Sequence, residues 1–177
     1  RILRRMMLMR VSNLSAYIEK LSASEEERQQ LVRDFLIGVT QFFRDPRYFD
    51  QLRDKVLKEL LRRDQDEFRV WVPGCSSGEE VFSIAMLIKE LQDKTGDRRP
   101  WKLFGTDIDL DALAIARMAI YDEDALAPLS PERRKEFFTE ENGYFQVENS
   151  LRKHCVFAPH NVLTDPPFSR LDLISCR

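Results

Sequence analysis

Residues 68–91 of the chain read FRVWVPGCSSGEEVFSIAMLIKEL. The β-branched and aromatic run Phe68–Val72 predicts a strand ending at Pro73, and the small residues of Gly74–Gly78 predict a tight loop. Beyond Glu79, apolar residues recur at helical spacing, at Val81, Ile84, Ala85, Ile88 and Leu91. A strand, a glycine turn and a helix in this order are typical of nucleotide-binding α/β domains, in which the backbone approaches a ligand at the helix start.

The residues downstream repeat this alternation. A second strand is predicted at Trp101–Gly105, followed by Thr106-Asp107-Ile108-Asp109 and a helix over about 110–119. Residues 121–155 interrupt the pattern, and the turn signal Asn142-Gly143 predicts a small antiparallel β insert there. Strands near Val156 and over 171–175 resume the alternation. We expect an α/β fold with a doubly wound, Rossmann-like parallel sheet over residues 68–177, truncated after about four strands.

The residues upstream predict an all-helical subdomain over 1–45 and a connecting helix within 46–67. Asn13 or Ser12 can cap one short helix, and Ser24 with Glu27 forms a capping box for another. Asp45 and Pro46 are typical of a helix start. Phe35, in the helix opened by Ser24, is expected to help close the helical bundle. Arg1, Arg4 and Arg5 share one helix face, which is either a solvated surface or a docking face for an acidic partner.

The overall composition excludes several classes of protein. The chain has 177 residues with a formal net charge of −2, 43% hydrophobic and 33% charged residues, so neither disorder nor a bulk attraction to nucleic acid is indicated. It contains no apolar run of membrane-spanning length. Three cysteines and two histidines support neither a disulfide framework nor a metal site, so we expect a cytoplasmic protein. Because the chain opens on Arg1, we expect it to be part of a longer protein.

Two kinds of chemistry fit the loop at residues 74–78. Gly-Cys-Ser-Ser-Gly matches the nucleophile elbow G-x-S-x-G, with Ser76 as the nucleophile of a serine hydrolase and Asp107 followed by His154 or His160 as its partners. The alternative is a cofactor site, because the loops after three successive strands supply residues 74–79, Asp107 and Asn161 to one sheet edge. The residues alone also allow Asp107 to be only a helix cap.

The cofactor interpretation favours a ligand without phosphate. The loop lacks G-x-G-x-x-G, and Glu79 at the helix start would repel a pyrophosphate. Asp107 is placed to accept hydrogen bonds from ribose hydroxyls, and Asn161 could contact an adenine edge. S-adenosylmethionine carries a sulfonium and an ammonium but no phosphate, so these residues favour it.

Four segments in order carry a family resemblance. They are Val39-Thr40-Gln41-Phe42-Phe43-Arg44-Asp45, residues 69–80 (RVWVPGCSSGEE), Thr106-Asp107-Ile108-Asp109, and residues 172–177 (DLISCR). Together they resemble the CheR family of chemotaxis receptor methyltransferases, which use S-adenosylmethionine to esterify receptor glutamates and release S-adenosylhomocysteine. The Arg-rich start is similar to that of CheR domains within larger fused signalling proteins.

The resemblance implies roles for individual residues. It places at the cofactor Thr40, Arg44, Gly74, Gly78, Glu79, Asp107, Asn161, Val162 and Arg177. Arg44 would meet the cofactor carboxylate, Glu79 the methionine end, Asp107 the ribose, and Asn161 with Val162 the adenine side. Gly38 stands where some members carry an asparagine that contacts the cofactor. Arg1, Arg4 and Arg5 resemble the face that meets the receptor. The insert over 121–155 resembles the family's small β-subdomain, which in some members tethers a receptor tail.

The implied reaction needs no catalytic group. A glutamate side chain is already ionised at neutral pH and attacks a methyl group on sulfonium without a general base. We therefore expect positioning residues, with no catalytic triad and no metal. A second interpretation is a non-catalytic sensor module that binds the same cofactor within a signalling protein.

Overall fold

The computed structural model describes residues 1–35, 40–63 and 66–177. The chain divides into two compact units, residues 1–38 and residues 39–177. Gly38, which stands where some family members carry a cofactor-contacting asparagine, lies outside the described residues.

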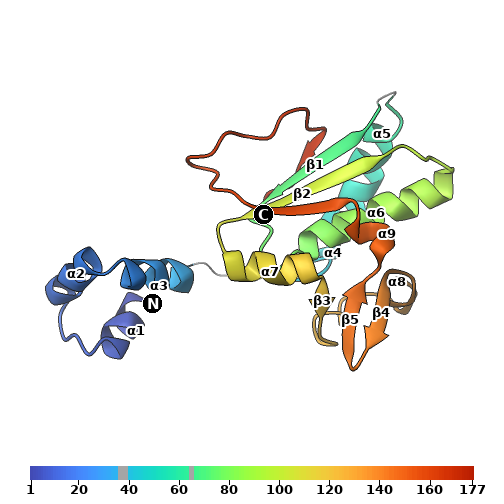
Figure 1. The fold of residues 1–177 in the computed structure, drawn as a ribbon. Helices are drawn as coiled ribbons and strands as arrows, with labels where there is room; N and C mark the ends of the chain where they lie inside the picture. Colours follow the sequence, from blue (N-terminus) through green and yellow to red (C-terminus); the bar gives the residue numbers. More distant parts are fainter. Residues whose placement is uncertain (36–39, 64–65) are drawn as a thin grey trace. The chain divides into compact units, whose positions relative to one another are not determined.

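The first unit consists of three helices, α1 (Ile2–Leu8), α2 (Leu14–Ala23) and α3 (Glu25–Phe35) (Figure 1). Asn13 caps α2 by accepting the Ala16 N–H at 2.9 Å. Ser24 accepts the Glu27 N–H at 3.1 Å, which is half of the expected capping box. The reciprocal bond from the Ser24 N–H to the Glu27 carboxylate is not formed, because Glu27 instead binds Arg5 and Tyr17. Phe35 was expected in the core, but its side chain is 51% exposed, so that expectation was wrong.

The Glu27 carboxylate is the polar centre of this unit. Arg5 donates to it from Nε at 3.0 Å and from Nη2 at 2.5 Å, and the buried Tyr17 hydroxyl donates at 2.8 Å. The Arg5 guanidinium, the largest cause, lowers the pKa of Glu27. The three helices are therefore joined by one ion pair with a shared hydroxyl, and Arg5 is only 13% exposed in its side chain.

The second unit is built on a parallel sheet. Its strands are β1 (Phe68–Pro73), β2 (Trp101–Asp107), β6 (Cys155–Pro159) and β7 (Leu173–Ile174), in the order β6-β2-β1-β7. The register aligns Pro73 with Thr106 and Asp107 with Pro159, so the carboxyl ends of β1, β2 and β6 are level. This confirms the α/β fold with a Rossmann-like sheet predicted from the sequence.

Helices α6 (Glu79–Thr95) and α7 (Leu110–Met118) lie along one face of the sheet (Figure 1). Buried α6 residues, among them Val81, Ile84 and Ile88, meet Val70, Val72 and Leu103 in one core. The alternate side chains Trp71 and Phe104 point the other way and contact Phe168 from the loop before β7. Alternation along the strands thus fills both faces of the sheet.

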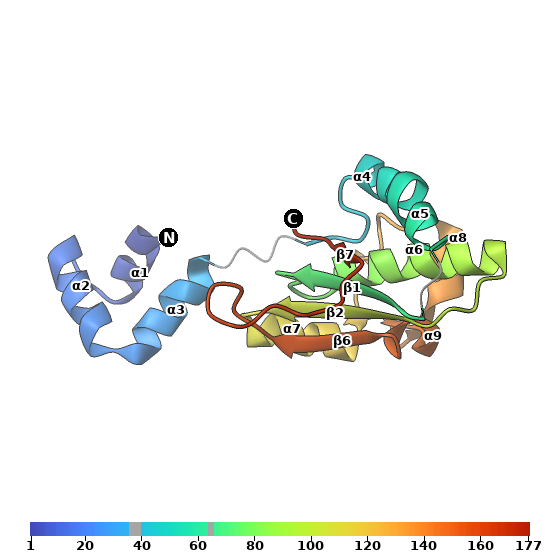
Figure 2. The ribbon, with the colours of Figure 1, turned by 90° about the horizontal axis from the view of Figure 1, so that it is seen from above.

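A helix with a π-helical middle follows residue 45. It comprises α4 (Pro46–Gln51), the π segment η1 (Leu52–Leu57) and α5 (Lys58–Leu60), and it packs against α6 (Figure 2). Asp45 is its N-cap residue, but the carboxylate makes no capping bond. Its partner is Arg177. The predicted helix start at Asp45 and Pro46 is therefore confirmed, and the Asp45 carboxylate binds Arg177 rather than a helix N–H group.

The predicted antiparallel insert is also confirmed. Strands β3 (Ile120–Tyr121), β4 (Phe138–Glu141) and β5 (Tyr144–Val147) form a separate sheet in the order β3-β5-β4. Helix α8 (Pro131–Phe137) precedes β4, and α9 (Asn149–Arg152) leads back to β6. Phe137, Phe138 and Val147 are buried with the main core, so the insert packs on the sheet domain.

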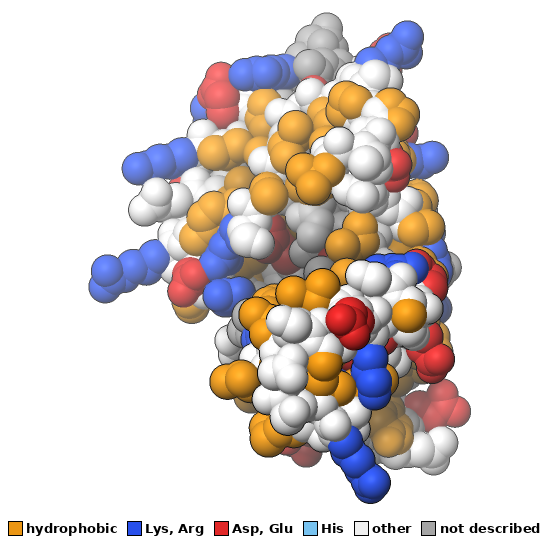
Figure 3. Space-filling view, turned by 90° about the vertical axis from the view of Figure 1, so that its left-hand side faces the viewer, with side chains coloured by type: hydrophobic (Ala, Val, Ile, Leu, Met, Phe, Trp, Pro, Cys, Tyr) orange, Lys and Arg blue, Asp and Glu red, His pale blue; other side chains and the backbone are white. Residues whose placement is uncertain are grey.

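The face of the described residues drawn in Figure 3 is mixed in charge. Lys and Arg side chains lie interspersed with Asp and Glu on the face drawn in Figure 3, consistent with the small net charge. Among the described residues, none of the helices has the length and apolar character needed to cross a membrane.

Candidate cofactor site

The strand order places a topological switch point between β1 and β7. From β1 the chain proceeds outward through β2 and β6, and then returns to the opposite side of β1 as β7. In open α/β sheets, ligands bind outside the carboxyl ends of the strands at such a point. The residues reaching this edge are the loop 74–78 after β1, Asp107 at the end of β2, residues 160–162 after β6 and residues 175–177 after β7.

The loop after β1 is shaped by residues with positive φ. Gly74 has φ +69° and Gly78 has φ +95°, a region that favours glycine. A side-chain carbon on Gly74 would meet no described atom within 4 Å, so the backbone there is open to a ligand. On Gly78 the same carbon would lie 3.0 Å from Ala116 Cβ in α7. Gly78 therefore lets α7 approach the start of α6, while Gly74 leaves room at the edge.

Asp107 joins the ends of β1 and β2. One carboxylate oxygen accepts the Ser76 N–H at 2.7 Å, and the other accepts the Asp109 N–H at 2.9 Å. Asp109, two residues on, accepts the N–H groups of Asp111 and Ala112 and caps α7. Asp107 is thus not the helix cap, and its carboxylate holds the glycine loop in place.

Glu79 is buried at the start of α6, with 7% of its surface exposed. The Ser77 hydroxyl lies 2.9 Å from both carboxylate oxygens, and the Thr40 side chain also hydrogen-bonds to it. Burial raises the pKa of Glu79, although these partners oppose the shift. The segment at Thr40 and the glycine loop therefore share one buried acid.

The β insert contacts this loop through Tyr121. Tyr121 donates its hydroxyl to the Ser77 carbonyl at 2.7 Å. Burial raises the pKa of Tyr121 well above its usual value, so the hydroxyl stays a donor. Its ring lies 5.0 Å from that of Phe42, which also contacts Phe138 in β4. The insert thus contacts both cofactor segments, the loop 74–78 and the residues near Thr40.

Arg177 closes the other side of the switch point. It donates to the Arg44 carbonyl at 2.6 Å and pairs with Asp45. Its guanidinium also lies over the Tyr48 ring, 4.8 Å from the ring centre. The exposed Arg44 and Arg177, far apart in sequence, are therefore neighbours in the structure.

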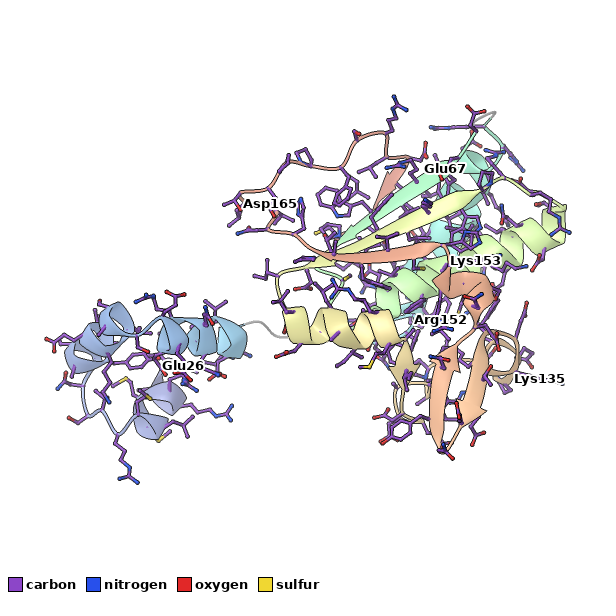
Figure 4. All side chains as sticks on the ribbon, viewed as in Figure 1. Glu26, Glu67, Lys135, Arg152, Lys153 and Asp165 are labelled. Atoms are coloured by element: carbon purple, nitrogen blue, oxygen red, sulfur yellow. The ribbon has the colours of Figure 1, made fainter. Side chains whose placement is uncertain are left out.

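Residues after β6 form a turn beside Asp107. The His160 N–H donates to the Asp107 carbonyl at 3.0 Å. The Asn161 side chain accepts the Leu163 N–H at 3.0 Å, and the Asn161 N–H donates to Asp165, seen in the long loop of Figure 4. The Asn161 side chain is therefore engaged within its own turn, and Val162 is 59% exposed.

The hydrolase interpretation finds no support in the histidines. The His160 ring bonds to the Pro166 carbonyl at 3.1 Å, and the His154 ring bonds to the Trp101 carbonyl at 3.0 Å. At Ser76 the structural contact is made by the backbone N–H. Burial, with Asp107 nearby, raises the pKa of the adjacent Cys75 thiol to about 12, so Cys75 is protonated at neutral pH.

Sequence reasoning missed several residues that shape this site. Ser77, Tyr121 and Ser175 bind its carboxylates and carbonyls, yet a lone Ser or Tyr carries no motif. The Glu80 carboxylate accepts a hydrogen bond from the Ser175 hydroxyl. For Ser175, the available sequence signal was its position directly after a short apolar strand.

The fold and the loops at its switch point define a class of protein, a doubly wound α/β domain with a ligand site outside the carboxyl ends of its strands. The family described as "CheR methyltransferase, SAM binding domain" matches residues 38–177. The chain therefore belongs to the CheR family, and its cofactor is S-adenosylmethionine.

Relatives agree with this assignment. The chemotaxis protein methyltransferases of Borreliella burgdorferi and Escherichia coli are 34% and 32% identical, over 93% and 100% of this chain. An uncharacterized 104.1 kDa protein of Rhodobacter capsulatus is 37% identical over 100% of the chain. The chain spans 62% of each of the two methyltransferases and 19% of the larger protein.

The residues present fit the cofactor. S-adenosylmethionine is cationic at its sulfonium and ammonium and has no phosphate, so a buried acid at the start of α6 suits it better than a dinucleotide. Asp107 supplies a second carboxylate at the end of the neighbouring strand, and Gly74 leaves the backbone open between them. Within the described residues, His, Cys, Asp and Glu side chains form no group of three able to hold a metal ion.

Proposed function

We propose that the protein transfers a methyl group from S-adenosylmethionine to glutamate side chains of chemotaxis-type receptor proteins. Family membership supports the reaction class. The observation that carries the proposal is a continuous set of contacts at the switch point. These contacts connect Asp107 to the loop at Ser76, Ser77 to Glu79, and Glu79 to Thr40.

The residues of the chain act by binding and orienting. Glu79 and Thr40 hold the methionine end, Asp107 the ribose, and Asn161 with Val162 the adenine side, while Arg44 and Arg177 border the carboxylate end. When bound, S-adenosylmethionine supplies a methyl group on a positively charged sulfur. Ser77 and Tyr121 hold the loop in place, because Ser77 donates to Glu79 and Tyr121 donates to the Ser77 carbonyl.

The acceptor carboxylate needs no activation. A glutamate side chain has a pKa of about 4.3 and is already an anion at neutral pH. The chain therefore contributes alignment, which can lower a barrier by about 7–11 kcal/mol. A variant that loses activity should do so mainly by misplacing the cofactor or the acceptor.

Receptor docking is proposed for the basic face of α1. Arg5 is already paired with Glu27, so Arg1 and Arg4 are the members of this face that are exposed. Arg1 donates to the Phe35 carbonyl at 3.0 Å, at the end of α3. In this proposal Arg5 holds the helix, and its neighbours meet the acidic partner.

Calorimetric titration with S-adenosylhomocysteine tests the cofactor assignment. We expect the protein to bind it and Asp107→Ala to bind at least about tenfold more weakly, because both the ribose contact and the loop anchor are lost. Asp111→Ala, on the exposed side of α7, is the matched control and should bind normally. Unchanged tight binding by Asp107→Ala would remove the ribose assignment.

Methyl transfer needs a separate measurement. Labelled methyl groups should appear on glutamates of a receptor cytoplasmic fragment as base-labile esters. Cofactor binding without any transfer would favour the sensor interpretation over the enzyme.

A further inference from the structure

Three side chains form a hydrogen-bonded relay at the switch point. The Ser175 hydroxyl donates to Glu80 Oε1 at 2.5 Å, and the Tyr48 hydroxyl lies 3.0 Å from the same Ser175 oxygen. They come from three separate segments: Glu80 from the first turn of α6, Ser175 from the end of β7, and Tyr48 from α4. The relay therefore joins elements that are 95 and 127 residues apart along the chain.

The direction of the relay follows from its chemistry. An ionised carboxylate only accepts, so Ser175 uses its single proton toward Glu80. The Ser175 oxygen is then left as an acceptor, and Tyr48 must donate to it. Ser175 is 1% exposed, so water cannot easily replace a missing partner.

Arg177 connects the relay to the cofactor residues. Its guanidinium lies over the Tyr48 ring and donates to the Arg44 carbonyl. At the other end, Glu80 adjoins Glu79, which binds Thr40 and Ser77. The relay thus connects Arg44 and Arg177 on one side of the site with Glu79 on the other.

We propose that Tyr48, Ser175 and Glu80 are positioning residues that hold Arg177 and residues 44–48 against the start of α6. They act through Arg44, Arg177 and Glu79. This inference rests on the proposed function, because it concerns the same cofactor site. It predicts that Tyr48, Ser175 and Glu80, which do not contact the cofactor themselves, jointly affect the affinity for the cofactor.

The test is calorimetric titration of S-adenosylhomocysteine, with thermal unfolding of the same samples. Tyr48→Phe removes one oxygen and keeps the ring under Arg177. We expect it and Ser175→Ala each to weaken binding about five- to tenfold. The double variant should bind about as weakly as either single variant, because residues that act as a unit are not additive.

Two further variants sharpen the comparison. Glu80→Gln keeps an acceptor oxygen for Ser175 and should retain more affinity than Glu80→Ala. Tyr144→Phe removes an exposed tyrosine hydroxyl from the insert hairpin and should bind as the unchanged protein does.

The possible outcomes separate the two proposals. If the unchanged protein binds and Tyr48→Phe binds equally well, the relay has no positioning role. The same conclusion follows if the two losses add, or if the melting temperature falls while affinity stays constant, as for a purely structural contact. If the unchanged protein fails to bind, the proposed function itself fails, and this inference fails with it.

Discussion

At the residue scale, two glycines of one loop have different tasks. Gly74 and Gly78 both have positive φ, but only Gly78 has neighbours, with Ala116 Cβ at 3.0 Å and Ala116 Cα at 3.3 Å from an added side-chain carbon. Gly78 thus combines a backbone requirement with a packing requirement. Gly74 carries only the first, which leaves its outer side free for a ligand.

Substituting these glycines should separate the two requirements. Gly78→Ala adds a left-handed penalty of about 1–2 kcal/mol and a contact with the α7 backbone, so we expect a loss of roughly 2–4 kcal/mol in unfolding free energy. Gly74→Ala, the matched control, should cost only about 1–2 kcal/mol. Urea unfolding of both variants measures the difference. Equal losses would show that α7 does not press on Gly78.

At the element scale, a buried ion pair joins the three N-terminal helices. Arg5 on α1 and Tyr17 on α2 both meet Glu27 on α3. Removing one partner of such a pair leaves the other buried and unsatisfied, which is usually destabilising. The capping-box pattern at Ser24 and Glu27 therefore predicted the Ser24 cap but not the position of the Glu27 carboxylate, which binds Arg5 and Tyr17 instead of the helix start.

This pair should make the N-terminal unit sensitive to acid. The pKa of Glu27 is lowered in the folded state, so the unfolded state binds more protons as the pH falls through the range below about 4.5. The stabilisation is complete above this range and is lost as the pH falls through the lowered pKa. Amide exchange of residues 2–35, measured from about pH 7 to about pH 3 and corrected for intrinsic rates, should show local opening at the acid end.

Glu27→Gln and Glu26→Gln provide the comparison. Glu26 is the exposed neighbour labelled in Figure 4, and its substitution should leave the acid sensitivity in place. Glu27→Gln should open these helices already at neutral pH and flatten the dependence on pH. An unchanged profile for Glu27→Gln would exclude the pair as its source.

At the scale of the whole molecule, the parallel sheet brings the site together. Residues 74–78, Asp107 and residues 160–162 follow the carboxyl ends of β1, β2 and β6, which lie level at one edge of the sheet. Residues 175–177 follow β7 on the other side of β1. The Thr40–Glu79 and Arg44–Arg177 contacts then attach the segment before α4 to this edge. The molecule thus forms its site from loops, while the strands and α6 provide rigidity.

A substitution at Ser76 tests the cofactor interpretation against the serine hydrolase interpretation. Asp107 binds the backbone N–H of Ser76, so Ser76→Ala should keep this contact. We expect Ser76→Ala to bind S-adenosylhomocysteine within about twofold of the unchanged protein, because no hydroxyl contact is invoked. Ester hydrolysis by the unchanged protein that disappears in Ser76→Ala would instead establish the hydrolase.

The sequence by itself determined the local elements and the family. Strand β1, the glycine loop, α6 and the insert were predictable because apolar periodicity and turn residues act over a few neighbouring positions. Asp107 and Glu79 could be predicted as candidate site residues, because Asp107 lies at a strand end and Glu79 follows the glycine loop. Only the tertiary structure decided the partners of Glu27, Asp45, Glu80 and Tyr121. Their hydrogen bonds join segments between 10 and 132 residues apart, and such pairings depend on how elements pack, which no local pattern records.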